Sequence, residues 1–287
     1  MAWHHLLLAL PLASALTPSK GCTNPTAPSL AAGNQTLTIN DKPRWYLLHP
    51  PTSYTPSVPH RLVFTLHAMG GNASQVAAGV GGYLPWYGLP ALDPSASHTT
   101  ATIYAAPNGL NAGWANRGGE DVALITTIRA QILADYCVDE DLVFSVGFSY
   151  GSSMSYALAC GAPDQFRAVG LQSGGNMSGC ATGEARKPLA LYGQHGVDGS
   201  DLNITAARVI RDQFVKLNGC EAPTGEAAVL LEKGSGTHKK VEYQGCREGF
   251  PVTWIEYDGG HTPQPKDKGA AATWSGEEVW KFFAQFK

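Results

Sequence analysis

The chain has 287 residues, with 20 Lys or Arg and 23 Asp or Glu, so its formal net charge is −3 and its charged fraction is 15%. This sparse, nearly balanced charge excludes a basic nucleic-acid binder, an acidic disordered tail and a charge-rich coiled coil. The 33 glycines and 19 prolines follow no period, which excludes collagen-like and low-complexity chains. A loop-rich globular protein remains, long enough for one large α/β domain or two small ones.

The N-terminus is typical of a secretory signal peptide over residues 1–15. A short apolar run at residues 6–13 ends in the small-residue pattern Ala13-Ser14-Ala15, which places cleavage after Ala15. The run is too short to span a bilayer, and no later segment reaches the ~20 apolar residues that a spanning helix needs. The sequence therefore predicts a secreted, extracellular protein that does not enter a membrane.

Cysteine usage agrees with an oxidising compartment. The six cysteines form no Cys-x-x-Cys pair, so three disulfides are expected and zinc ligation is not. Cys220 and Cys246 bracket a loop-and-hairpin excursion, and we pair them with each other. Three pairings remain open among Cys22, Cys137, Cys160 and Cys180. Four Asn-x-Ser/Thr sequons are candidate glycosylation sites: Asn34, Asn72, Asn176 and Asn203.

The first elements after the leader are predicted to be irregular and then antiparallel. Residues 16–34 form an N-terminal tether that begins rich in Pro, Thr and Ser. Two strand-like runs at residues 35–40 and 44–49 flank the turn residues Asn40-Asp41-Lys42, which predicts a β-hairpin. A proline-studded surface loop follows at residues 50–59.

Beyond residue 60 the pattern becomes buried strand, loop, helix. Apolar runs of strand length occur at residues 61–66, 102–106, 142–146, 166–171, 189–192 and 252–257. Helical periods occur at residues 121–136, 152–160, 206–217 and 276–286. Strands that alternate with helices predict a mostly parallel central sheet, opened by the N-terminal antiparallel hairpin. Since no repeat or linker divides the chain, we expect a single catalytic domain over residues 35–287.

A nucleophile elbow is the sharpest chemical signal in the chain. The segment Gly147-Phe148-Ser149-Tyr150-Gly151 lies between a predicted strand and a predicted helix, the context that the Gly-x-Ser-x-Gly motif requires. The glycines permit a sharp turn that lifts the Ser149 hydroxyl above the sheet, at the N-terminus of a helix. Ser149 is the predicted catalytic nucleophile.

A serine nucleophile needs a base and an acid downstream in this type of fold. His261 follows the predicted strand 252–257 in a tight Gly-rich turn and is the candidate base. Four other histidines are expected to lie in loops or hairpins exposed to solvent: His49, His60, His98 and His238. The acid is expected in the loop after the strand 189–192, which leaves Asp198 and Asp201 open.

An acyl-transfer enzyme also needs two backbone N–H donors that stabilise the developing oxyanion. One is expected at Tyr150, directly after the nucleophile. The other is expected at Met69, in the loop that follows the strand 61–66. These assignments require neither a metal nor a cofactor.

With these motifs, the chain resembles the secreted fungal feruloyl esterases of carbohydrate esterase family 1, which are related to polyhydroxybutyrate depolymerases. The matching segments cover most of the mature chain in order: residues 66–72, 107–110, 114–121, 135–139, 147–152, 194–196 and 259–261. The resemblance implies an α/β-hydrolase fold. It also implies hydrolysis of the esters that join ferulic or related hydroxycinnamic acids to plant cell-wall arabinoxylan or its oligosaccharides.

The resemblance also bears on the acid and on the substrate. The family position for the acid is Gly199, and in an extended loop Asp201 shares its face whereas Asp198 points away, so Asp201 is favoured and Asp198 is the alternative. Aromatic residues that could stack on a phenolic ring, or serve only in packing, are Trp114 and Trp86, with Tyr87, Tyr150 and Trp274. We expect a monomer without a nucleic-acid partner. The competing functions are an acetylxylan esterase, a polyester depolymerase, and a catalytically silent hydrolase fold that only binds.

Overall fold

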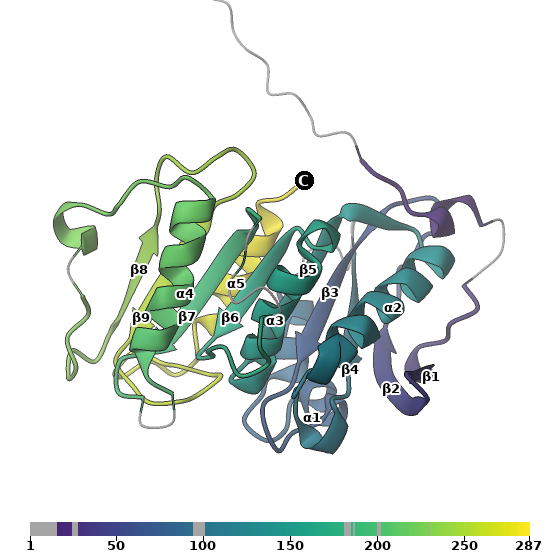
Figure 1. The fold of residues 1–287 in the computed structure, drawn as a ribbon, viewed down its shortest axis with the longest axis horizontal. Helices are drawn as coiled ribbons and strands as arrows, with labels where there is room; N and C mark the ends of the chain where they lie inside the picture. The colour runs from purple at the N-terminus through teal and green to yellow at the C-terminus, as the bar shows by residue number, and fades with distance from the viewer. Residues whose placement is uncertain are drawn as a thin grey trace, which may run out of the picture.

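The computed structural model describes residues 16–24, 28–93, 101–180, 185, 187–199, 202–228 and 230–287. The predicted signal peptide, His98 and Asp201 lie outside the described residues. The described strands form one sheet in the order β1-β2-β4-β3-β5-β6-β7-β9-β8 (Figure 1).

The N-terminal hairpin is confirmed. Strand β1 (Gly33–Ile39) pairs antiparallel with β2 (Lys42–His49), and β2 pairs antiparallel with β4. The turn residues Asn40 and Asp41 both have positive φ, 49° and 60°. Two successive residues of this kind match a type I′ turn, whose twist suits a hairpin.

The parallel centre of the sheet is also as predicted. Its strands are β3 (His60–Leu66), β4 (Thr102–Pro107), β5 (Val138–Phe148), β6 (Ala168–Gln172), β7 (Ala190–Gly196) and β9 (Val252–Tyr257). Each pairs in parallel with its neighbour in this group. Parallel neighbours place their carboxyl ends at one edge of the sheet, so the loops after β3, β5, β7 and β9 gather there.

Helices cover both faces of the sheet, which explains the continuous apolar strands. On one face lie α2 (Glu120–Asp135), α3 (Tyr150–Gly161) and α4 (Ile204–Leu217), whose apolar side chains share one core cluster (Figure 1). On the other face lie α1 (Ala73–Ala78) and α5 (Ser275–Ala284), within a second cluster. No helix in the described part of the chain is both long and apolar enough to cross a membrane.

Two elements were not predicted, and one histidine was misplaced. Helix α1 is only six residues long, and β8 (His238–Glu242) is a half-exposed edge strand that pairs antiparallel with β9. Both are too short or too polar to leave an apolar period in the sequence. The expectation that His60 is exposed to solvent was wrong, because it begins β3 and is only 2% exposed.

Three disulfides link the described cysteines. The predicted pair Cys220–Cys246 is confirmed. The other two bonds join Cys22 to Cys137 and Cys160 to Cys180. The first of these fastens the N-terminal segment to the start of β5, where the Ser19 amide also donates to the Val138 carbonyl at 2.8 Å. The described beginning of the predicted tether therefore packs on the domain.

The sequon asparagines have different local roles. The Asn72 and Asn203 side chains cap α1 and α4 by accepting hydrogen bonds from the amides of Gln75 and Thr205. Asn34 lies in the edge strand β1, and Asn176 is exposed in the loop after β6.

Candidate active site

Ser149 lies at the turn between β5 and α3 in a strained backbone conformation, with φ 56° and ψ −114°. A side chain at Gly147 would collide with the backbone of Gly151, and one at Gly151 would collide with the Leu66 carbonyl. The Ser149 amide is fixed to the Gln172 carbonyl at the end of β6 at 2.8 Å. A non-glycine residue with φ of this sign is costly, so it indicates that the surrounding structure determines the turn.

The predicted base lies beside this turn. Ser149 and His261 line the same cavity of about 450 Å³, together with Met69 and Tyr83. The His261 ring packs against Phe148, with a distance of 4.5 Å between the ring centroids. Residues that are 112 positions apart in the chain thus meet at the carboxyl ends of β5 and β9.

Of the two candidate acids, the structure describes only Asp198. Asp201 lies outside the described residues. The Asp198 side chain is 51% exposed, and its carboxylate pairs with Lys233 Nζ at 2.7 Å. The Asp198 amide donates to the Gly259 carbonyl at 3.0 Å, so the segment that follows β7 contacts the turn that carries His261.

Two further carboxylates near His261 in the sequence, those of Asp258 and Asp267, are hydrogen-bonded to other protein groups. Asp258 accepts hydrogen bonds from the amides of Gly234 and Gly236 at 2.9 and 2.7 Å, and these bonds lower the pKa of its carboxyl. Asp267 accepts from His238 Nδ1 at 2.8 Å. Both carboxylates are therefore engaged away from the cavity.

The loop over residues 67–71, which we call the oxyanion loop, is fixed by bonds to several elements. The Ala68 amide donates to the Tyr83 hydroxyl at 2.8 Å, and the Gly70 amide donates to the Ala112 carbonyl at 2.8 Å. Within the described residues, the amides of Met69 and Tyr150 donate to no protein acceptor. Neither of the two predicted oxyanion donors is therefore occupied by a protein acceptor in the described residues.

His67 anchors the oxyanion loop, a role that the sequence reasoning missed. Its buried ring lies 4.7 Å from the Trp114 ring. Nδ1 donates to the Ala68 carbonyl at 2.8 Å, and Nε2 accepts from the Gly109 amide at 3.0 Å. Burial lowers the pKa of His67 to about 4, so the ring is neutral in this tautomer near neutral pH.

The predicted aromatic contacts divide into two groups. Trp114 and Tyr150 border a second cavity of about 390 Å³, which shares Met69 with the first and also contains Arg117. Trp114 is nevertheless fully buried, and its indole N–H donates to the His67 carbonyl at 2.7 Å. Trp86 packs on His49 and Tyr104, away from both cavities.

The other two aromatic candidates also contact protein groups. The Tyr87 hydroxyl donates to the Leu66 carbonyl at 2.7 Å and accepts from the Phe148 amide at 2.9 Å. The hydroxyl thereby joins the ends of β3 and β5. The Trp274 ring packs against His238 and Tyr257.

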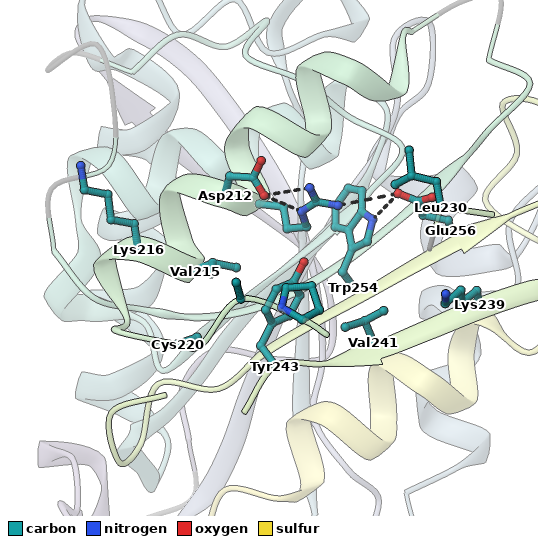
Figure 2. A pocket seen from close by; sticks show the side chains of 13 residues that line it. Asp212, Val215, Lys216, Cys220, Leu230, Lys239, Val241, Tyr243, Trp254 and Glu256 are labelled. Atoms are coloured by element: carbon teal, nitrogen blue, oxygen red, sulfur yellow. Dashed lines mark hydrogen bonds and ion pairs between the residues drawn. The ribbon is translucent and has the colours of Figure 1, made fainter. Parts of the chain in front are cut away.

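A third cavity, of about 400 Å³, lies beside the edge strand β8, between α4, β8 and β9 (Figure 2). Its lining includes Trp254, Tyr243 and Glu256 but no serine or histidine. Burial alone would raise the pKa of Glu256, but the two hydrogen bonds from Arg208 and one from Trp254 lower it overall. The described lining of this cavity therefore does not contain the serine and histidine that a Ser–His mechanism requires.

Among the residues that the structure describes, no group of three or more His, Cys, Asp or Glu side chains could hold a metal ion. The candidate site therefore consists of Ser149, His261 and the amides of Met69 and Tyr150, the types of group that serine hydrolases use.

Comparisons with known proteins identify the family. Residues 44–193 match the family model described as esterase PHB depolymerase. Feruloyl esterase D of Neurospora crassa is 42% identical over 98% of this chain and 95% of its own length. Feruloyl esterase C of Emericella nidulans is 42% identical over 97% of each chain.

Solved structures share the fold at low sequence identity. An acetyl xylan esterase from Aspergillus awamori superimposes with a TM-score of 0.60 at 17% identity, covering 88% of this chain and 99% of its own. A ferulic acid esterase gives 0.58 at 14% identity, covering 95% and 100%. The sheet is thus that of an α/β-hydrolase. The chain belongs to the feruloyl esterase family, a group of carboxylic ester hydrolases within the PHB-depolymerase-type esterases.

Proposed function

We propose that this protein is a secreted esterase that releases ferulic acid, or a related hydroxycinnamic acid, from plant cell-wall arabinoxylan. The proposed catalytic triad is Ser149, His261 and Asp201. The observation that carries the proposal is the strained Ser149 turn, which presents the hydroxyl to a cavity that also contains His261. The names of the relatives support the feruloyl substrate.

Acylation follows from the positions of these groups. Ser149 Oγ attacks the ester carbonyl carbon while His261 takes the hydroxyl proton. The carbonyl oxygen becomes an oxyanion that accepts hydrogen bonds from the amides of Met69 and Tyr150. When the tetrahedral intermediate collapses, the carbon–oxygen bond to the sugar breaks and His261 returns the proton to the leaving sugar oxygen. The feruloyl group remains on Ser149 as an ester.

Deacylation repeats these steps with water as the nucleophile. His261 removes a proton from water, which attacks the acyl carbon, and the second intermediate uses the same two amides. Its collapse breaks the bond to Ser149 Oγ, which regains a proton from His261, and ferulate is released. The acid keeps the imidazole in the required tautomer and stabilises the imidazolium.

Three observations support Asp201 as the acid. The Asp198 carboxylate is exposed and paired with Lys233, so its use would require breaking that pair. Asp258 and Asp267 are bonded to other groups. Asp201 follows Asp198 in the loop that contacts the histidine-bearing turn at Gly259.

We assign the sugar and the acyl group of the substrate to the two cavities that share Met69. His261 has to reach the leaving oxygen, so the sugar occupies the cavity that His261 and Tyr83 line. The acyl group then lies on the other side of the oxyanion donors, where the second cavity opens at Tyr150 and Arg117. An acetyl group would leave this cavity of about 390 Å³ nearly empty, which favours a bulkier acyl group over the acetylxylan alternative.

The decisive test combines a nucleophile variant with three substrates. Wild-type protein should hydrolyse methyl ferulate with a higher kcat/KM than p-nitrophenyl acetate and should leave a polyhydroxybutyrate film intact. Ser149→Ala should lower kcat on methyl ferulate by about 10⁶-fold, because no other group in the cavity replaces the nucleophile. A serine-directed phosphonate should label wild-type protein and not this variant.

Ser155→Ala is the matched control. Ser155 is a buried serine of α3, the helix that follows Ser149, and its hydroxyl bonds to Ser145 rather than facing the cavity. It should retain activity and phosphonate labelling. Retention of more than a few per cent of the activity in Ser149→Ala would contradict the assignment, and absence of labelling in wild-type protein would favour the binding-only alternative.

A further inference from the structure

One buried hydroxyl holds both sides of the turn that carries His261. Tyr257 is the last residue of β9, and its side chain is 2% exposed. Its hydroxyl lies 3.1 Å from the Gly260 carbonyl and 3.2 Å from the Thr262 carbonyl. The single hydroxyl proton is thus shared between the carbonyls that immediately flank His261.

The same hydroxyl connects the turn to the neighbourhood of the nucleophile. Ser173 Oγ lies 2.9 Å from the Tyr257 oxygen and can donate to it, because the tyrosine proton is directed to the two carbonyls. Ser173 is buried, with φ 49°, and its amide donates to the Gln194 carbonyl at 2.8 Å. The adjacent Gln172 carbonyl accepts the Ser149 amide. The end of β6 therefore fixes both the nucleophile turn and the turn of the base.

A glycine of β7 makes this arrangement possible. A Cβ at Gly196 would collide with the Gly259 carbonyl and would lie 2.9 Å from Tyr257 Cε2. The absence of a side chain there lets the turn lie directly on the sheet, within reach of the Tyr257 hydroxyl. This gives a physical role to the glycine of the Gln194-His195-Gly196 segment, which the catalytic assignment leaves unexplained.

We propose that Tyr257 is a positioning residue for catalysis: its hydroxyl fixes the orientation of the turn that carries His261 relative to Ser149. The proposal rests on the proposed function, in which His261 is the general base. Burial raises the pKa of Tyr257, so the hydroxyl keeps its proton across the working pH range and remains a donor. A displacement of about 1 Å in a catalytic group can cost on the order of 10²-fold in rate.

The test is Tyr257→Phe, which keeps the ring and its edge contact with Trp274 while removing the hydroxyl. The kcat on methyl ferulate should fall by about 10- to 100-fold, with KM within about twofold, because the substrate cavities are unchanged. Ser173→Ala should have a smaller effect, since the Tyr257 hydroxyl can still donate to the two carbonyls.

Tyr156→Phe is the matched control for the loss of a buried tyrosine hydroxyl. Tyr156 is 1% exposed and donates to Gln213 between α3 and α4, outside the catalytic cavities. Its kcat should stay near the wild-type value. Thermal unfolding of both tyrosine variants reports any general loss of stability. A kcat for Tyr257→Phe equal to that of Tyr156→Phe would overturn the proposal.

Two further readouts separate positioning from a purely structural effect. The acidic limb of the kcat/KM profile reports protonation of the free base, and a displaced imidazole should shift its apparent pKa in Tyr257→Phe but not in Tyr156→Phe. In a His261→Ala background, Tyr257→Phe should cause no further loss, because the group that it positions is gone. If the losses in kcat from His261→Ala and Tyr257→Phe multiply fully in the double variant, the proposal is contradicted.

The same experiments distinguish this proposal from the proposed function. If His261→Ala alone retains wild-type activity, the assignment of the base is wrong. If His261→Ala is inactive while Tyr257→Phe behaves like the control, only the positioning role is wrong.

Discussion

The oxyanion loop and the turn over residues 258–262, which we call the histidine turn, line one cavity with Ser149 and are held in different ways. The oxyanion loop is bonded through His67, Ala68 and Gly70 to the segments around Gly109, Ala112 and Tyr83. In the histidine turn, the carbonyls on both sides of His261 depend on one hydroxyl, that of Tyr257. Both segments are thus bonded to other elements, since Asp258 and Gly259 of the histidine turn are bonded to Gly234, Gly236 and Asp198. The difference is that the two carbonyls next to His261 share a single donor, whereas each bond of the oxyanion loop has its own partner.

The largest expected effect concerns the proposed acid, Asp201. Asp201→Asn should lower kcat on methyl ferulate by about 10⁴-fold without unfolding the protein, because an amide no longer stabilises the imidazolium. Asp198→Asn is the matched control, and it removes only an exposed pair with Lys233. It should stay within about twofold of wild-type kcat. If the Asp198 variant is the inactive one, the two roles must be exchanged.

A smaller effect tests the oxyanion loop through its buried histidine. The pKa of His67 is about 4 in the folded protein, below the ordinary value of 6.5. Above pH 6.5 the ring is neutral in both the folded and the unfolded chain. As the pH falls from 6.5 toward 4, only the unfolded chain gains a proton at this position. The free energy of unfolding should therefore drop by about 3 kcal/mol from this group alone.

Urea denaturation at a series of pH values between 7 and 4 measures this loss. His67→Gln should be less stable than wild type at pH 7, because the buried hydrogen bonds are disturbed, but its stability should decline less on acidification. If the free energy of unfolding falls equally steeply with pH in wild type and in His67→Gln, His67 is not the source of the acid-induced loss of stability.

The smallest expected effect comes from Tyr83→Phe, which is compared directly with Tyr257→Phe. Tyr83→Phe removes the acceptor of the Ala68 amide, but the bonds of His67 and Gly70 remain. We expect a loss of about fivefold in kcat, the equivalent of one ordinary hydrogen bond. This loss is smaller than that expected for Tyr257→Phe. Because Tyr83 also borders the substrate cavity, KM is measured alongside. Equal losses of kcat in Tyr83→Phe and Tyr257→Phe would show that the shared donor beside His261 matters no more than one bond of the oxyanion loop.

Local patterns in the sequence were sufficient for much of the fold. The apolar runs predicted the parallel strands, and the residues Asn40 and Asp41 predicted the hairpin turn that their positive φ values confirm. The spacing of Gly147 and Gly151 predicted the sharp turn at Ser149. In each case the cause is local, because strand burial, turn twist and a close backbone approach constrain the residues at those same positions.

The edge strand and two of the disulfides required the tertiary structure. Strand β8 is half-exposed and charged, so its formation depends on pairing with β9 rather than on an apolar period. Cys22 and Cys137 are separated by 115 positions, and no local signal selects that pair. The choice between Asp198 and Asp201 likewise depends on the path of a loop, which alternation along the sequence does not determine.

The sequence by itself determined which residues carry the proposed chemistry: a serine between two glycines, and a histidine after a strand and a pair of glycines. Only the tertiary structure decided what holds them, since the supporting hydrogen bonds join residues far apart in the chain. The tautomer of His67 is set by Gly109, and the position of the histidine turn depends on a tyrosine hydroxyl that Ser173 contacts from another strand. A hydroxyl or an imidazole has no periodicity that reveals its partner, because its bond is made across the fold.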